Sequence, residues 1–231
     1  MAMAAIRVSV LAAYARTALG VAYAWSQSYM GADFFSKWRF FTAADPTHGL
    51  VDYVDFREAV ATGLVNATPN RVYMGADTST TLGNNSRGRR SVRIESHATY
   101  NSGLFVITLD HIPTGCATWS AFWMVGLDDK HPWPSWGEYD IVEGIHEVEK
   151  VSTSLHTTSG CDQSSITGVE WKKGISKAAD NCDIHAAGQW GNQGCGQNGP
   201  SGSMGAGFNR KGGGTYAAEW DPVAEHRWWW P

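Results

Sequence analysis

The sequence is poor in charged residues and lacks a large basic cluster. Charged side chains make up 17% of the 231 residues, and the formal net charge is −4. The largest group of Lys and Arg is the run RGRR at residues 87–90, which is too small to follow a phosphate backbone. No apolar run reaches the roughly 18 residues that a membrane-spanning helix needs. We therefore expect neither nucleic acid nor a membrane as a partner.

Cysteine is scarce, and the Gly-rich region lacks the features of a nucleotide-binding loop. The four cysteines, at positions 116, 161, 182 and 195, lie in Gly-rich polar stretches, which suits disulfides in an exported protein. Their spacings match no CxxC zinc pattern, and sequence alone leaves their pairing open. The Gly-rich stretch at residues 188–207 lacks GxxxxGK[ST], and it has no GxGxxG in a strand-to-helix context, so we expect no nucleotide site.

The first 24 residues have the pattern of a secretory signal peptide. They contain an early Arg7, a middle rich in Ala, Val and Leu, and a small-x-small ending at Ala22 and Ala24. Arg16 interrupts the apolar region, so an irregular N-terminus is the alternative. We predict a signal peptide at residues 1–24 and a single domain at residues 25–231, secreted to the extracellular space.

Glycine and tryptophan are abundant, with 26 and 12 residues, and short extended segments alternate with turn residues. This pattern predicts an all-β fold. Only residues 56–65 have a helical face, and Gly63 limits that helix to a turn or two. We expect residues 160–214 to be a long loop ordered by its cysteines. The predicted strands are residues 71–77, 90–96, 103–112, 120–126, 138–145, 154–159 and 215–220.

The strand predicted at residues 138–145 carries three acids, Glu138, Asp140 and Glu143. In a regular strand Glu138 and Asp140 share one face, whereas Glu143 faces the opposite, apolar side. A charged Glu in an apolar core costs too much free energy. The spacing therefore predicts a β-bulge between Asp140 and Glu143 that returns Glu143 to the shared face and leaves Ile141 buried.

The predicted bulge also sets the distance between the two glutamates. Because the bulge residue adds no length, the five positions from Glu138 to Glu143 span the length of four strand residues, about 13 Å between Cα atoms. Side chains that lean together then leave roughly 5 to 6 Å between the carboxyl groups. A retaining glycosidase needs about this separation, whereas an inverting enzyme needs about 6.5 to 9.5 Å. The alternatives are a calcium site and a solvated acidic face, but calcium requires ligands that converge from several loops.

These acids form the ExDxxE signature of glycoside hydrolase family 16, and the chain resembles its laminarinase-like branch, specifically the fungal endo-1,3(4)-β-glucanases. The likeness covers about residues 26 to 220. It includes FFSKWRFFTAADPTHGLVDYV at 34–54, GRRSVRIES at 88–96, GLFVITLDHIPTGCATWSAFWMVG at 103–126, LHTTSGC at 155–161 and FNRKGGGTYAAEW at 208–220.

The resemblance implies roles for the acids. Glu138 would be the nucleophile, Glu143 the general acid and base, and Asp140 the acid between them. An ionised Glu138 and Asp140 disfavour a third negative charge, so we expect Glu143 to stay protonated until Glu138 is esterified.

The resemblance also implies the substrate site and the fold. Trp123, Trp133 and the more ambiguous Trp119 would stack on sugar rings, and His156 would lie beside the acids. For each of the four, a structural role in the core is the alternative. The implied fold is a β-jelly-roll sandwich of two curved antiparallel sheets, concanavalin-like, acting as a monomer on β-glucan. The chemistry needs no cofactor, although a structural calcium ion would be compatible with the fold.

The sequence departs from the family at several places. Tyr139 replaces an aliphatic residue, Ser120 replaces a proline, and the segment at residues 127–132 is longer than usual. Relatives continue beyond the EW at 219–220, so we expect a domain that lacks its last strands. A non-catalytic β-glucan-binding protein and a cell-wall transglycosylase are therefore kept as alternatives to a glucanase.

Overall fold

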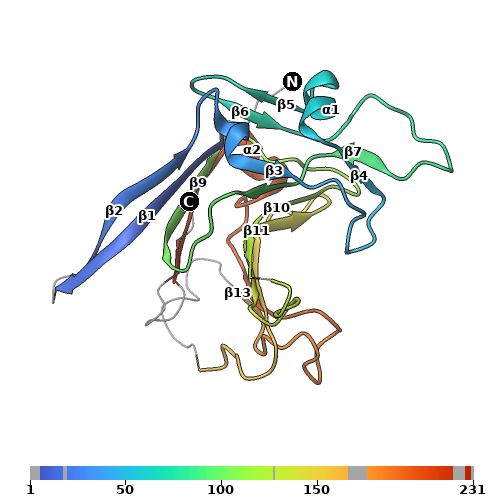
Figure 1. Cartoon of the computed structure of the whole chain (residues 1–231). Coiled ribbons are helices and arrows are strands. Elements are labelled where there is room, and N and C mark those ends of the chain that lie inside the picture. The colour runs from blue at the N-terminus through green and yellow to red at the C-terminus, as the bar shows by residue number, and fades with distance from the viewer. Residues whose placement is uncertain (1–5, 18–19, 127, 166–175, 221–226, 230–231) are drawn as a thin grey trace. The chain divides into compact units, whose positions relative to one another are not determined.

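A computed structural model describes residues 6–17, 20–126, 128–165, 176–220 and 227–229, and these residues form an almost entirely β structure (Figure 1). The all-β prediction is therefore confirmed. The elements in chain order are β1 Ile6–Thr17, β2 Gly20–Tyr29, the 3₁₀ helix η1 Phe34–Lys37, β3 Trp38–Phe40, β4 Val51–Tyr53, α1 Phe56–Ala61, β5 Val65–Ala67, β6 Val72–Met74, β7 Arg89–Ser91, β8 Ile94–Ser96, β9 Gly103–Leu109, β10 Trp119–Val125, β11 Glu138–Ile145, β12 Ser152–His156, β13 Ser176–Ala179, β14 Cys195–Asn198, α2 Gly205–Arg210, β15 Gly214–Trp220 and β16 Arg227–Trp229.

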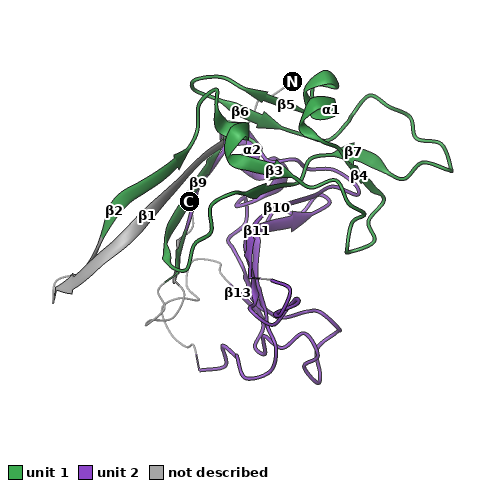
Figure 2. Ribbon diagram, viewed as in Figure 1, with its two compact units in different colours: residues 1–111, 218–228 green, residues 112–217, 229–231 purple. Residues whose placement is uncertain are grey.

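The chain divides into two compact units, coloured separately in Figure 2. Unit 1 contains residues 1–111 and 218–228, and unit 2 contains residues 112–217 and 229–231. One five-stranded sheet has the order β16-β15-β9-β1-β2, and its strands β1, β2 and β9 belong to unit 1. The other has the order β10-β11-β12-β14-β13 and lies wholly in unit 2.

Unit 1 is built on the antiparallel strands β1, β2 and β9. Every second residue of β9 is buried, and Phe105, Ile107 and Leu109 are at most 7% exposed. This alternation is typical of a strand with one face on an apolar core. Strand β1 and part of β2 lie within residues 1–24, the range predicted to be a signal peptide, and the signal peptide stays a prediction.

Unit 2 places β11 between β10 and β12, with antiparallel pairing on both sides. Tyr139, Ile141 and Val142 of β11 are buried. Gly144 allows Met204 to pack closely, because a Cβ at Gly144 would lie 2.5 Å from the Met204 Cε atom. The α2 residue Phe208 stacks on Tyr216. Strand β11 is therefore held by apolar packing as well as by its two neighbouring strands.

One predicted strand is confirmed at its exact bounds, and others needed correction. The strand predicted at 138–145 coincides with β11, whereas the strand predicted at 71–77 is shorter and forms β6. The strand predicted at 90–96 is two strands: β7 pairs in parallel with β4, and β8 pairs antiparallel with β3. Short strands with little alternation depend on partners that are distant in sequence, and local patterns do not reveal such partners.

The predicted helix at residues 56–65 is confirmed in a shorter form. Asp55 accepts the backbone N–H of Glu58 and caps the N-terminus of α1. The helix ends at Ala61, and Gly63 follows with a φ of 71°, a left-handed conformation that glycine adopts without steric cost. None of the helices that the structure describes has the length and apolar character needed to span a bilayer.

The Gly-rich region at residues 160–214 is more structured than the predicted loop, because its described part contains β13, β14 and α2. Cys182 and Cys195 form a disulfide, and Cys116 and Cys161 are free. Cys195 is the first residue of β14 and pairs in register with Leu155, next to His156. The disulfide thus attaches the Gly-rich region to the sheet beside a predicted site residue.

Candidate active site

Strand β11 contains the bulge that the spacing of its acids predicts. On β10, Phe122 pairs with Val142 and Trp123 pairs with Asp140, so Ile141 is the additional residue. The register with β12 also shifts between Asp140 and Glu143. Ile141 is only 2% exposed, as expected. The bulge prediction is confirmed, and its apolar extra residue is accommodated in the core.

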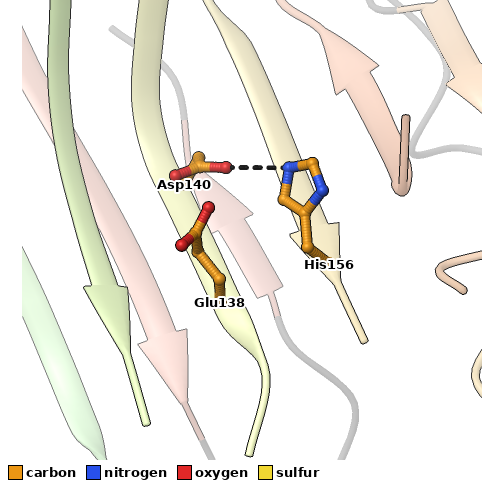
Figure 3. Close-up of side chains that lie close together, drawn as sticks. All are labelled: Glu138, Asp140 and His156. Atoms are coloured by element: carbon orange, nitrogen blue, oxygen red, sulfur yellow. Dashed lines mark ion pairs between the residues drawn. The ribbon is translucent and has the colours of Figure 1, made fainter. Parts of the chain in front are cut away.

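The bulge brings the three acids to one face of the sheet. Glu138, Asp140 and Glu143 pair respectively with His156, Ser154 and Ser152 of β12. Those β12 residues alternate along their strand and therefore share a face, and paired residues in an antiparallel sheet point the same way. Figure 3 shows Glu138 and Asp140 directed to the same side as His156.

Each acid has a hydrogen-bonding or ion-pair partner that lies elsewhere in the sequence. The indole Nε1 of Trp119 donates to Oε1 of Glu143 across 2.7 Å. Trp133 Nε1 donates to Oε2 of Glu138 across 3.0 Å. Asp140 is paired with the imidazole of His156. Each indole thus binds one oxygen of a glutamate carboxyl group, which favours one orientation of that group.

His156 Nε2 lies 3.2 Å from Oδ2 of Asp140, and both residues are buried (Figure 3). Burial lowers the pKa of His156, but the hydrogen bond and the charge of Asp140 outweigh it, so the pKa is raised overall. Glu138 and Glu143 add to the rise. The acid face therefore includes an imidazole whose cationic form is more stable than that of an ordinary histidine.

The tryptophans predicted to contact substrate lie on the acid face or at its end. Trp119 and Trp133 are 60% and 38% exposed, so neither is a core residue. Trp123 is half-buried and pairs with Asp140, which places it on the acid face. All four predicted residues, including His156, thus gather around Glu138, Asp140 and Glu143.

The Glu143 carboxyl group has its pKa raised from an ordinary 4.5 to about 7. Burial is the largest cause, the charge of Asp140 is the second, and Glu138 adds less. The Trp119 hydrogen bond and the His156 charge oppose the rise. The expected rise is present, but its main source is burial, and Glu138 contributes less than the sequence argument assumed.

Sequence reasoning missed Trp136, which lies two residues before Glu138 and is 56% exposed. Its ring stacks on His131, with centroids 4.3 Å apart and planes 23° apart. Asp128 holds that imidazole through a 2.8 Å contact with Nδ1. The run WPSWGE contains both Trp133 and Trp136, so a second tryptophan next to the acids was the available signal.

Three of these groups could also converge on a cation. Ligand atoms of Glu138, Asp140 and His156 lie within 4.8 Å of one another. An imidazole in the set suits a transition metal better than calcium, which prefers oxygen ligands. The structural calcium ion compatible with the family fold remains a separate prediction.

Comparisons with known proteins point to one family. The family described as "XgeA-like, catalytic GH16 domain" matches residues 38–231. A probable endo-1,3(4)-beta-glucanase of Aspergillus fumigatus is 39% identical over 211 residues, which are 90% of this chain and 30% of that protein. The chain thus spans about a third of the length of this curated relative.

Two solved structures show the same fold. GH16 Laminarinase 16A from Phanerochaete chrysosporium, solved with β-glucans in its donor and acceptor sites, is 32% identical with a TM-score of 0.81, over 97% of this chain and 67% of that one. An elongating GH family 16 β-1,3-glucosyltransferase is 35% identical with a TM-score of 0.78, over 89% of this chain and 65% of that one. The jelly-roll expectation is thereby confirmed. The motif, the match over residues 38–231 and the shared fold show that the chain belongs to glycoside hydrolase family 16.

Proposed function

We propose that this chain is a retaining endo-1,3(4)-β-glucanase that acts by double displacement, with Glu138 as nucleophile and Glu143 as general acid and base. The observation that carries the proposal is a Glu143 carboxyl with a pKa of about 7 on the same sheet face as Glu138. One carboxyl that keeps its proton near neutrality beside a nucleophilic carboxylate is the arrangement that glycoside cleavage requires.

In the first step, a Glu138 oxygen attacks the anomeric carbon while the bond from that carbon to the leaving glucan oxygen breaks. Glu143 gives its proton to that oxygen, and Glu138 becomes esterified to the sugar. In the second step, the Glu143 carboxylate takes a proton from water as the water oxygen attacks the anomeric carbon. The Glu138 ester then breaks, and the sugar leaves with its original anomeric configuration.

The pKa of Glu143 suits both steps. Because Glu138 is a minor cause of the rise, its esterification lowers the pKa of Glu143 only slightly. A value of about 7 nevertheless leaves large fractions of both the acid and the carboxylate near neutral pH. The ratio of acid to carboxylate at Glu143 is therefore set mainly by burial and by the charge of Asp140, and only slightly by Glu138.

The proposed substrate is a β-1,3-glucan or a mixed β-1,3/1,4-glucan. The A. fumigatus relative is named a probable endo-1,3(4)-beta-glucanase, and the solved laminarinase holds β-glucans. Exposed Trp119, Trp133 and Trp136 offer flat apolar faces for sugar rings. No cofactor takes part in the proposed steps, and we propose that the protein acts as a monomer.

We also propose that the protein is extracellular. The Cys182–Cys195 disulfide supports an oxidising compartment, as does the signal pattern at residues 1–24. The sequons that begin at Asn66 and Asn84 would be available for glycosylation on that route.

Reducing-sugar release from laminarin by the full chain tests the activity. Glu138→Gln should abolish release. Glu149→Gln should not, because Glu149 is an exposed acid whose carboxyl group lies 3.8 Å from the Arg210 guanidinium. Proton NMR of the first product should show the β anomer. An initial α anomer, or near-normal turnover by Glu138→Gln, would show that the assigned roles are wrong. If the protein were retained on a laminarin affinity gel but released no reducing sugar, the glucan-binding alternative would be favoured.

Transglycosylation is the second candidate function, because one structural relative is an elongating β-1,3-glucosyltransferase. In that reaction a sugar hydroxyl replaces water in the second step, and Glu143 takes the hydroxyl proton. Mass spectrometry of products from laminari-oligosaccharides separates the two functions. Products longer than the starting oligosaccharide indicate transfer, and only shorter products indicate hydrolysis.

A further inference from the structure

The segment before β10 is attached to the turn after β11 through a single residue, His146. We name residues 113–118 the acid-side loop. The N–H of Gly115 donates to the His146 carbonyl across 3.1 Å, and the His146 N–H donates to the Thr118 carbonyl across 2.7 Å. The Ala117 N–H donates to the imidazole Nδ1 of His146 across 2.8 Å. His146 thus uses its backbone carbonyl, its backbone N–H and its side chain on one loop.

Two residues of this contact have left-handed backbones. The φ of His146 is 57° and the φ of Ala117 is 63°. A left-handed Ala has an unfavourable Cβ contact, so it persists only where neighbouring interactions compensate. The hydrogen bond from Ala117 to the imidazole is such an interaction, because it involves the N–H of the strained residue itself.

The acid-side loop leads directly into the residue that contacts Glu143. Thr118 precedes Trp119, the first residue of β10, which pairs with Ile145. The Trp119 indole is 60% exposed, so side-chain packing restrains it weakly, yet it donates to Glu143 across 2.7 Å. The backbone position of residues 117 and 118, together with the pairing of Trp119 and Ile145, therefore helps to determine where this indole lies.

We propose that His146 is a positioning residue for the general acid: its Nδ1 fixes Ala117, the acid-side loop fixes Trp119, and the Trp119 indole orients the Glu143 carboxyl. The inference rests on the proposed role of Glu143 as general acid. In this proposal His146 touches neither the substrate nor Glu143, and it acts through the acid-side loop and Trp119.

The matched variants are His146→Asn and His146→Gly. Both residues tolerate a left-handed backbone, so neither adds strain. Asn provides a side-chain oxygen acceptor on a short side chain, and Gly provides none. We expect Asn to retain most of the wild-type kcat on laminarin and Gly to lose about tenfold or more, because small misplacements of a catalytic group are costly. Glu147→Ala, an exposed neighbour, is the control for the turn.

A leaving-group comparison separates positioning of the acid from a general loss of structure. A laminaribioside with a 2,4-dinitrophenyl leaving group needs little protonation in the first step. The kcat/KM of His146→Gly for this substrate, which reports that step, should therefore stay close to the wild-type value. An equal loss of kcat/KM on both substrates would overturn the inference, as would equal kcat values for the Asn and Gly variants on laminarin.

Glu143→Gln distinguishes failure of this inference from failure of the proposed function. If Glu143→Gln loses kcat/KM on laminarin but not on the dinitrophenyl substrate, Glu143 is the general acid, because kcat/KM on that substrate reports the first step alone. A His146→Gly variant with wild-type kinetics would then refute the positioning role alone. If Glu143→Gln cleaves laminarin normally, the proposed function itself is wrong.

Discussion

Trp119 donates its indole N–H to the Glu143 carboxyl across 2.7 Å, although the two residues lie on different strands and are 24 positions apart. A donor of this kind stabilises the carboxylate, so it opposes the rise in pKa that burial and Asp140 cause, and the resulting pKa is about 7. The contact thereby tunes the proposed general acid as well as orienting it.

Removal of this donor should move the pH profile upward. Trp119→Phe keeps an aromatic ring but lacks the N–H, so the pKa of Glu143 should rise above its present value of about 7. Because the protonated form is active in the first step, the alkaline limb of kcat/KM should shift to higher pH. Trp190→Phe, at a tryptophan that is 75% exposed, is the control and should leave the limb unchanged. An alkaline limb at wild-type pH in Trp119→Phe would contradict the assignment.

Asp140→Asn should shift the same limb in the opposite direction. The Asp140 charge is the second cause of the raised pKa of Glu143, so its removal should lower that pKa. The pKa of His156 should fall as well, because Asp140 is the main group that raises it. The pH dependence of kcat/KM and the titration of His156 by NMR provide the two measurements. Asp180→Asn, an exposed acid paired with Lys177, should change neither.

Glu143 should also make the fold less stable as pH rises. Its pKa in the folded protein exceeds the ordinary 4.5, so the folded state keeps a proton that the unfolded state releases between about pH 4.5 and 7. Stability from this group is complete below that window and is lost through it, by about 3 kcal/mol at most. Glu143→Gln should therefore be more stable than wild type at pH 8 but not at pH 4, as measured by urea unfolding. A pH-independent difference would show that ionisation is not its cause.

Loss of the disulfide should destabilise unit 2. Cys182 and Cys195 are 13 positions apart, and a bridge that closes a loop of this length contributes about 3 kcal/mol. Cys182→Ser with Cys195→Ser should therefore lower the melting temperature measured by circular dichroism. Cys116→Ser, at an exposed free cysteine, is the matched control. Equal melting temperatures for the double variant and the control would refute this contribution.

Trp136→Ala should weaken binding of long glucans. One face of Trp136 is stacked on His131, which Asp128 holds in place, so the indole is restrained before substrate binds. We expect KM for laminarin to rise about tenfold, the size of one aromatic stacking contact, with kcat little changed. Trp25→Ala, at another exposed tryptophan, is the comparison. A fall in kcat with an unchanged KM would contradict a role in binding.

The sequence by itself determined the class of fold and the architecture of the acidic strand. Apolar residues beside Glu138 and Asp140 predicted a strand, and the cost of burying Glu143 predicted the bulge. These inferences succeeded because strand alternation and charge burial are local and energetically strong. The family signature identified the same three residues and the aromatic residues around them.

Only the tertiary structure decided how those residues are paired. The contacts from Trp119 to Glu143 and from His156 to Asp140 join strands whose register depends on the whole sheet. The same is true of the pairing of Cys182 with Cys195. Burial, the largest cause of the raised pKa of Glu143, is likewise a property of the packed protein, since neighbours distant in sequence remove the carboxyl from water.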